Sequence, residues 1–190
     1  MAGMGHNGGP TMEPGFGFRK YAWGRARAEL LPSLPLQIVR IRVARAQRLG
    51  LDYKTYATIR AASGRDITGF LFSGNALSIR PGRLELPGAV GQRLAELDGA
   101  ADRIVAVYAP AHPDAVLAAN PGRLDSAASA PGFTDNWATL RTRIRAALRG
   151  RNMPPDGVVL VAATTVEREW RVAGKLAGVL AVGQMFHPGP

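Results

Sequence analysis

Short apolar runs alternate with helical patterns over the last two thirds of the chain, and this alternation limits the fold more than any other feature. The runs are rich in Val and Ile and cover 67–72, 104–109, 158–163 and 179–182, while helical patterns cover 88–98, 135–149 and 166–177. Strands that alternate with helices form βαβ units, in which the strands run parallel. Unbroken apolar runs indicate strands that are buried on both faces. We therefore predict an α/β domain over 66–187, with a small, mainly parallel sheet of about four strands flanked by helices.

Two consecutive helices are expected before this domain. Residues 36–49 combine IVRIRV, which alternates as a strand does, with ARAQRL, which is rich in helix formers, and we favour a helix. A second helix is expected over 53–63, where Asp52 can cap its start and Gly64 can end it. The chain therefore enters the α/β domain from a helical pair.

The remaining segments carry weaker patterns. Residues 19–31 are expected to form a short helix that ends before Pro32. Residues 1–18 contain six Gly and two Pro, so we predict a flexible tail there. Residues 110–133 hold four Pro among many Ala, Ser and Gly, and we interpret them as a long loop with one helical turn.

Positive charge is concentrated in the segment 19–65. The chain carries a formal net charge of +10, of which −1 lies in 1–18, +9 in 19–65 and +2 in 66–190. A concentrated excess of this kind creates a local field that attracts polyanions. A solvated basic face without any ligand is the plain alternative. The charge therefore points to nucleic acid or an acidic protein as the partner. No membrane partner is expected, because no apolar run is long enough to span a bilayer.

The stretch RAQRLGLDYKTYATIRAASGR, residues 45–65, carries one motif with functional content. It resembles a helix-turn-helix DNA-binding module of the bacterial repressor type. The resemblance implies a close helix crossing at a small residue, a left-handed glycine in the turn, an apolar residue that fills the corner, a capped second helix and two inward-facing residues on that helix. The matching positions are Ala46, Gly50, Leu51, Asp52, Tyr56 and Ile59.

The same resemblance implies which side chains would meet DNA. The front of the second helix would face the groove, with Tyr53, Lys54 and Thr58, and Lys54 and Thr58 could reach base edges. The arginines would contact phosphates, namely Arg42, Arg45, Arg48, Arg60 and Arg65. The leading hypothesis is a regulatory DNA-binding protein whose α/β half senses, dimerises or recruits. A non-catalytic module that binds an acidic protein through the same arginines is the alternative, and a homodimer is a further option.

Polar residues follow several of the expected strands, where parallel sheets bind ligands. Ser73 and Asn75 follow the first run, His112 the second, and Thr164 the third. These four residues define a candidate pocket for a small enzyme, although each also suits a polar strand-to-loop turn. Residues 67–182 faintly resemble haloacid-dehalogenase-like phosphatases. That family needs two Asp residues after its first strand, where Ser73 and Asn75 stand here, so the resemblance implies a relative without that catalysis.

Several classes of function are disfavoured by what the sequence lacks. It contains no cysteine, which excludes disulfides, thiolate metal sites and a Cys nucleophile. No apolar run approaches the roughly 18–20 residues that span a bilayer, and the N-terminus does not match a signal peptide. We therefore expect a cytoplasmic protein without metal or cofactor. An enzyme is the less favoured alternative, because no catalytic constellation stands out.

Overall fold

The computed structural model describes residues 34–186. The chain divides into two compact units, Met1–Val39 and Arg40–Pro190, and the fold described below is that of the second unit. The tail expected over 1–18 and the helix expected over 19–31 lie outside the described residues.

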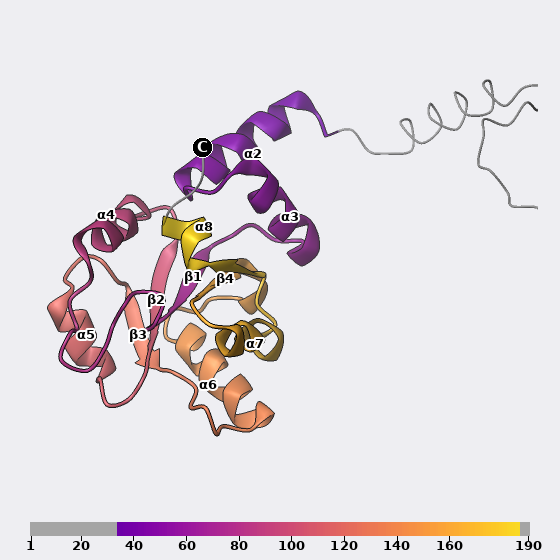
Figure 1. Cartoon of the computed structure of the whole chain (residues 1–190). Coiled ribbons are helices and arrows are strands. Elements are labelled where there is room, and N and C mark those ends of the chain that lie inside the picture. The colour runs from indigo at the N-terminus through magenta and orange to yellow at the C-terminus, as the bar shows by residue number, and fades with distance from the viewer. Residues whose placement is uncertain (1–33, 187–190) are drawn as a thin grey trace, which may run out of the picture. The chain divides into compact units, whose positions relative to one another are not determined.

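Five parallel strands form one sheet in the second unit (Figure 1). The strands are β1 (Gly69–Ser73), β2 (Asp102–Val107), β3 (Ser126–Ser129), β4 (Val158–Ala162) and β5 (Gly178–Ala181). Their order is β3-β2-β1-β4-β5, and every neighbouring pair runs parallel. All residues of β1 and β4 are buried, as unbroken apolar runs predict for strands covered on both faces. The expected α/β fold is confirmed, with five strands instead of about four.

The strand that the sequence did not reveal is β3, whose sequence SAAS lies inside the expected loop 110–133. It is an edge strand and pairs with β2 alone, from Ser126 opposite Ile104 to Ser129 opposite Val107. Its residues are small and mostly half-buried, so backbone pairing defines it and apolar side chains do not. Helix α5 (Pro113–Ala119) lies in the same segment. The loop prediction is therefore wrong over these two elements.

Helices cover both faces of the sheet and make three layers (Figure 1). Along β1, Phe70 and Phe72 point into one core, while Leu71 points into the other. The Phe70 side carries α4 (Gly88–Glu96), α5 and α8 (Val182–Phe186) together with the helical pair that precedes β1. The Leu71 side carries α6 (Trp137–Arg149) and α7 (Thr165–Gly174), with Trp170 buried between α7 and the sheet. A short 3-10 turn, Pro155–Gly157, leads into β4.

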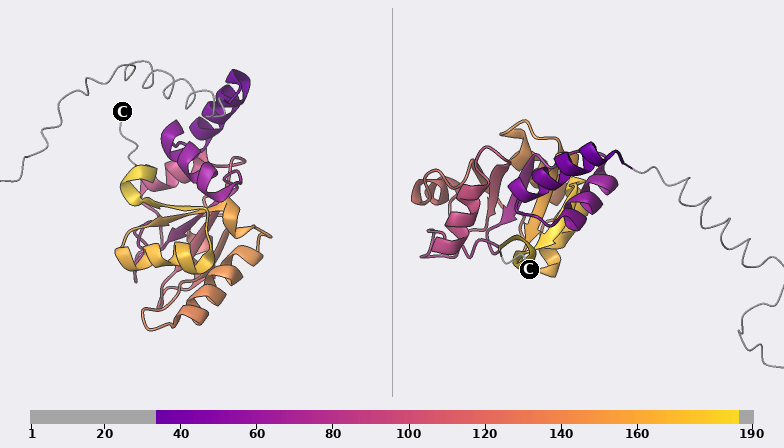
Figure 2. Two further views of the ribbon diagram at one scale, coloured as in Figure 1. Left: turned by 90° about the vertical axis from the view of Figure 1, so that its right-hand side faces the viewer. Right: turned by 90° about the horizontal axis from the view of Figure 1, so that it is seen from above.

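The helical pair consists of α2 (Leu36–Arg48) and α3 (Tyr53–Ser63), so the helix favoured over 36–49 is confirmed. Figure 2 shows α3 lying against the β4–β5 part of the sheet. There Ile59 packs so closely on Gly178 that a Cβ on this glycine would lie 3.0 Å from the Ile59 side chain. Tyr56 and Ile59 belong to the same buried cluster as Phe70 and Val159. The basic helices and the sheet therefore share one hydrophobic core.

The strand order reverses at β1, and this reversal indicates where on the sheet a ligand is expected to bind. The chain steps from β1 to β2 to β3 with α4 and α5 on one face, and then returns to β4 on the other side of β1 with α6 on the opposite face. If every crossover connection has the same hand, the connecting helices must change to the other face of the sheet when the strand order changes direction. In open α/β sheets, ligands bind at the carboxyl ends of the strands where the order reverses. The carboxyl ends of β1 and β4 define that place in this protein.

Candidate functional site

Residues 49–52 form the turn that joins α2 to α3. Gly50 adopts the left-handed conformation, with φ of 59°, and Leu51 is buried in the corner. The Asp52 carboxylate accepts a hydrogen bond of 2.9 Å from the Thr55 N–H and so caps α3. Hydrogen bonds from the Thr55 residue hold the pKa of Asp52 below its usual value. Tyr56 and Ile59 both point inward.

Asp66 fastens this helical pair to the start of β1. The Asp66 carboxylate accepts hydrogen bonds from the Tyr56 hydroxyl at 2.8 Å and from the Arg45 Nε at 3.0 Å. Arg60 lies 3.3 Å from the same carboxylate. Burial alone would raise the pKa of Asp66, but the Tyr56 hydroxyl and the Arg45 charge outweigh it and hold the pKa below its usual value. Arg45 and Arg60 are therefore engaged in an internal network.

The other N–H groups of Arg45 are also occupied. They donate to the backbone carbonyls of Ala100 at 3.0 Å and Ile67 at 2.6 Å. A guanidinium that uses three of its donors inside the protein positions α2 on the sheet. The phosphate contact expected of Arg45 would compete with these internal bonds.

The remaining residues of the expected DNA-facing set are more accessible. Tyr53 is half-buried against the core, and Arg65 is exposed but lies 3.0 Å from Asp156. Thr58 is exposed, and its hydroxyl donates to the backbone carbonyl of Lys54 at 2.8 Å. Within residues 34–186, no carboxylate lies at ion-pair distance from four cations of the pair, namely Arg40, Arg42, Arg48 and Lys54.

Arg93 of α4 holds the α2–α3 turn from the inner side. Its guanidinium donates to the Leu49 carbonyl at 3.0 Å and to the Met185 carbonyl at 3.3 Å, and it pairs with Glu96 at 2.8 Å. A Cβ on Gly50 would lie 1.5 Å from this guanidinium. The positive φ therefore favours glycine at position 50, and an added Cβ would also displace the Arg93 guanidinium.

A buried carboxylate occupies the carboxyl edge of the sheet where the strand order reverses. Glu167 is 0% exposed. Its Oε1 accepts hydrogen bonds from the Asn75 amide at 2.8 Å and the Tyr108 hydroxyl at 3.0 Å. Its Oε2 accepts from the backbone N–H groups of Ala163 at 2.8 Å and Thr164 at 2.9 Å. Each oxygen therefore has two donors, which is the compensation that a buried carboxylate needs.

This carboxylate ties together the segments that follow β1, β2 and β4. Burial and the charge of Glu167 raise the pKa of Tyr108, so its phenol stays protonated and remains a donor. The Thr164 hydroxyl in turn accepts from the Glu167 N–H at 3.2 Å, which completes a capping box at the start of α7. Glu167 is sealed from solvent and saturated with donors, so it acts here as a structural anchor.

The four expected pocket residues have different surroundings. Asn75 and Thr164 meet at Glu167. Ser73 is buried, and its hydroxyl accepts from the Ala76 N–H at 3.1 Å within the turn after β1. The His112 side chain is 72% exposed, with its Nδ1 3.6 Å from Asp114. The structure therefore brings two of the four together, around a residue that was not among them.

Sequence reasoning missed Glu167 and Tyr108 as members of this cluster. The spacing of Thr164 and Glu167 matches the capping-box pattern, which was a usable signal for the start of a helix. No local pattern indicated that Tyr108 would reach the same carboxylate, because the two residues are 59 positions apart.

Two adjoining pockets open at this edge. The larger has a volume of about 500 Å³ and lies beyond β2 and β3, where His112 and Arg143 are among its lining residues. The smaller has a volume of about 160 Å³ and includes Asn75 and Arg80. Tyr108 and Phe133 line both.

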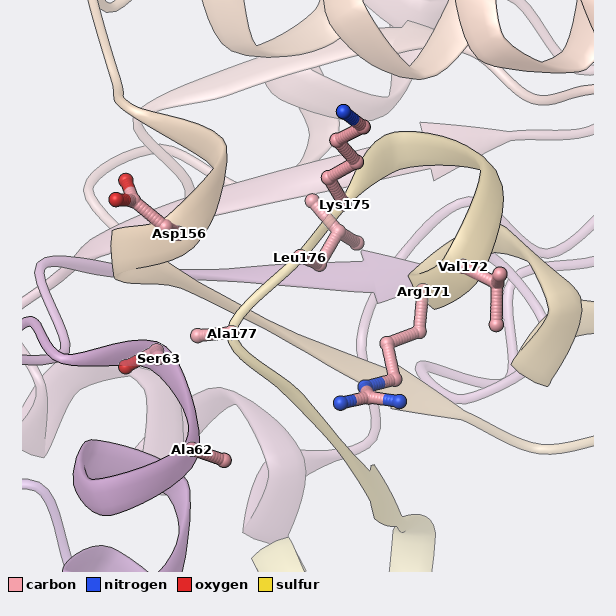
Figure 3. Close-up of a pocket in the computed structure, with 8 residues that line it drawn as sticks. All are labelled: Ala62, Ser63, Asp156, Arg171, Val172, Lys175, Leu176 and Ala177. Atoms are coloured by element: carbon pink, nitrogen blue, oxygen red, sulfur yellow. The ribbon is translucent and has the colours of Figure 1, made fainter.

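A third pocket of about 300 Å³ lies at the opposite, amino edge of β4 and β5 (Figure 3). Small and apolar residues supply much of its lining, and its charged members are Asp156, Arg171 and Lys175. Figure 3 shows these three side chains pointing in different directions, so no polar groups converge on one point. Convergent polar groups distinguish ligand sites from surface hollows. The carboxyl-edge pockets are therefore the better candidates.

Among the described residues, no group of three or more His, Cys, Asp or Glu side chains could hold a metal ion. Helices α2 to α8 include none that is both long and apolar enough to cross a bilayer. Comparison of the chain with protein-family models, curated protein sequences and solved structures finds no match.

Proposed function

We propose that the protein binds duplex DNA through the helical pair α2–α3. One observation carries the proposal, namely that α2 and α3, joined by a turn with a left-handed glycine, carry four cations that have no carboxylate at ion-pair distance among residues 34–186. These cations are Arg40, Arg42, Arg48 and Lys54. Arginine and lysine side chains supply the phosphate contacts that dominate the affinity of proteins for DNA. A basic surface on consecutive helices therefore suits a phosphate backbone.

The outward side of α3 supports this use. Lys54 and Thr58 lie one turn apart and are both exposed, and Ala61 follows them on the exposed side. Small side chains allow a helix to approach the edges of bases closely, and the major groove is about 12 Å wide, which admits one helix. Thr58 would then meet base edges, while Lys54 and the arginines of α2 contact the phosphates.

Ion pairs inside the protein exclude several arginines from the proposed phosphate contacts. Arg45 and Arg60 are bound to Asp66, and Arg65 is paired with Asp156. The proposed phosphate contacts are therefore Arg40, Arg42, Arg48 and Lys54, while Arg45 and Arg60 position the helices. Arg40 enters this set because it is exposed at the start of the second unit.

Fluorescence anisotropy with a labelled duplex of random sequence tests the proposal. The test variant is Arg42→Gln/Arg48→Gln/Lys54→Gln. The matched control is Arg141→Gln/Arg145→Gln/Arg149→Gln, which removes the same charge from exposed positions of α6 on the other face of the sheet. We expect the test variant to weaken binding by at least about tenfold at low salt and the control to weaken it much less.

Two outcomes would contradict the proposal. Equal loss in both variants would mean that only the net charge matters. Absence of binding by the native protein at about 50 mM salt would remove the proposal altogether. Capture of an acidic protein after nuclease treatment, with no DNA affinity, would favour the interaction module instead.

A further inference from the structure

An exposed aromatic ring stands beside the two carboxyl-edge pockets. Phe133, in the segment between β3 and α6, is 75% exposed. Its ring stacks on that of Tyr108, with centroids 5.5 Å apart and planes within 3° of parallel. An exposed phenylalanine held in a fixed orientation offers a flat apolar surface to a planar ligand.

The support behind this ring is rigid. The Tyr108 hydroxyl is held by Glu167, and the Tyr108 ring lies 6.0 Å from the buried ring of Trp170. Glu167 is held in turn by Asn75 and by the first N–H groups of α7. We call the stacked rings of Phe133 and Tyr108 the aromatic wall. A wall that is already ordered loses little conformational entropy when a ligand binds.

The space beside the wall has the size of a small-molecule site. Ligand pockets commonly occupy about 300–1,000 Å³ and are mainly apolar with a few polar groups. The larger pocket has a volume of about 500 Å³, and nearly half of its lining residues are Ala or Pro, including Pro110, Pro113 and Pro131. The smaller one, about 160 Å³, continues on the Asn75 side. The pair lies at the edge where open α/β sheets bind ligands.

The charges around the two pockets differ. In the larger pocket, Arg143 is neutralised by Asp135 at 2.8 Å, and His112 lies near Asp114. In the smaller pocket, Arg80 has no carboxylate at ion-pair distance among residues 34–186. An anionic group would therefore be most stable beside Arg80, next to the aromatic wall.

We propose that these two pockets form one binding site for a mononucleotide. The base stacks on Phe133, the sugar occupies the larger pocket, and the phosphate pairs with Arg80. Aromatic side chains bind all bases with little selectivity, because every base has a π-face. The site binds without catalysis, and it does not depend on DNA binding by α2–α3.

Isothermal titration calorimetry on the full chain tests the site with AMP, UMP, adenosine and inorganic phosphate. We expect saturable binding of AMP and UMP, weaker binding of adenosine, and little binding of phosphate alone. Phe133→Ala should weaken AMP binding by about tenfold or more, whereas Phe133→Trp should retain it. Arg80→Gln should weaken AMP binding and leave adenosine binding unchanged. Arg123→Gln, an exposed arginine outside both pockets, is the matched control.

Three results would overturn this inference. The first is the absence of saturable AMP and UMP binding, and the second is unchanged affinity in Phe133→Ala. The third is phosphate binding as tight as AMP binding, which would indicate a plain anion site. Thermal unfolding verifies that each variant is folded. Because Phe133 is exposed, we expect the melting temperature of Phe133→Ala to stay close to that of the native protein.

Discussion

Asp66 should be one of the most stabilising polar residues of the described chain, because it joins both helices of the pair to β1. Asp66→Ala removes the acceptor of the Tyr56 hydroxyl and the Arg45 Nε, and it removes the ion-pair partner of Arg60. Hydrogen bonds to charged groups contribute roughly 1.5–3 kcal/mol each. The Asp66 side chain is 37% exposed, so water replaces part of this loss. We expect the free energy of unfolding to fall by about 2–4 kcal/mol.

Urea denaturation at neutral pH, followed by far-UV circular dichroism, measures this loss. Tyr56→Phe removes a single hydroxyl and should cost about 1–2 kcal/mol. Because Tyr56 and Asp66 are in direct contact, the double variant should cost less than the sum of the single variants. Asp114→Ala, at a side chain that is 86% exposed, is the control and should stay within about 0.5 kcal/mol of the native protein.

The contribution of Asp66 to the free energy of unfolding should depend on pH. The pKa of Asp66 in the folded protein is below the ordinary value of 3.8. The stabilisation by Asp66 is therefore complete above pH 3.8 and is lost as the pH falls through the folded-state pKa. The difference between the native protein and Asp66→Asn should therefore shrink in strongly acidic urea titrations. Loss of less than about 0.5 kcal/mol in Asp66→Ala at neutral pH, or additive effects in the double variant, would refute the reasoning.

Two further predictions concern other fixed points of the fold. Glu167→Gln replaces an acceptor with an amide that must present its NH₂ group to some of the existing donors. We therefore expect the free energy of unfolding, measured by urea denaturation, to fall by about 2–4 kcal/mol. An unchanged free energy of unfolding would contradict the role of Glu167 as a structural anchor. Gly50→Ala forces a Cβ into a left-handed conformation and against Arg93, so thermal unfolding should occur at a clearly lower temperature, by about 5 °C or more. An unchanged melting temperature would show that Arg93 moves without cost.

The features that local sequence determines were predictable. Short apolar runs located β1, β2, β4 and β5, because buried strands of a parallel sheet carry mostly apolar side chains. The turn at Gly50 and the cap at Asp52 follow from neighbouring residues alone. The edge strand β3 carried no such signal, since its pairing with β2 uses the backbone.

The features that depend on distant residues were not predictable. Counting charges along the chain placed the positive excess in 19–65, but ion pairs with Asp66 and Asp156 occupy three of its arginines. Arg65 and Asp156 are 91 positions apart, so no window of sequence contains both. The meeting of Asn75, Tyr108 and Glu167 likewise requires the strand order, which brings the ends of three strands together.

The salt dependence of duplex DNA binding tests the central proposal most directly. Each phosphate contact contributes about −0.9 to the slope of log K against log salt concentration. If Arg42, Arg48 and Lys54 contact phosphates, the triple Gln variant should have a slope that is shallower by about 2–3, while the α6 control keeps the native slope. A native slope near zero, or identical slopes in the native protein and the triple variant, would contradict DNA binding through α2–α3.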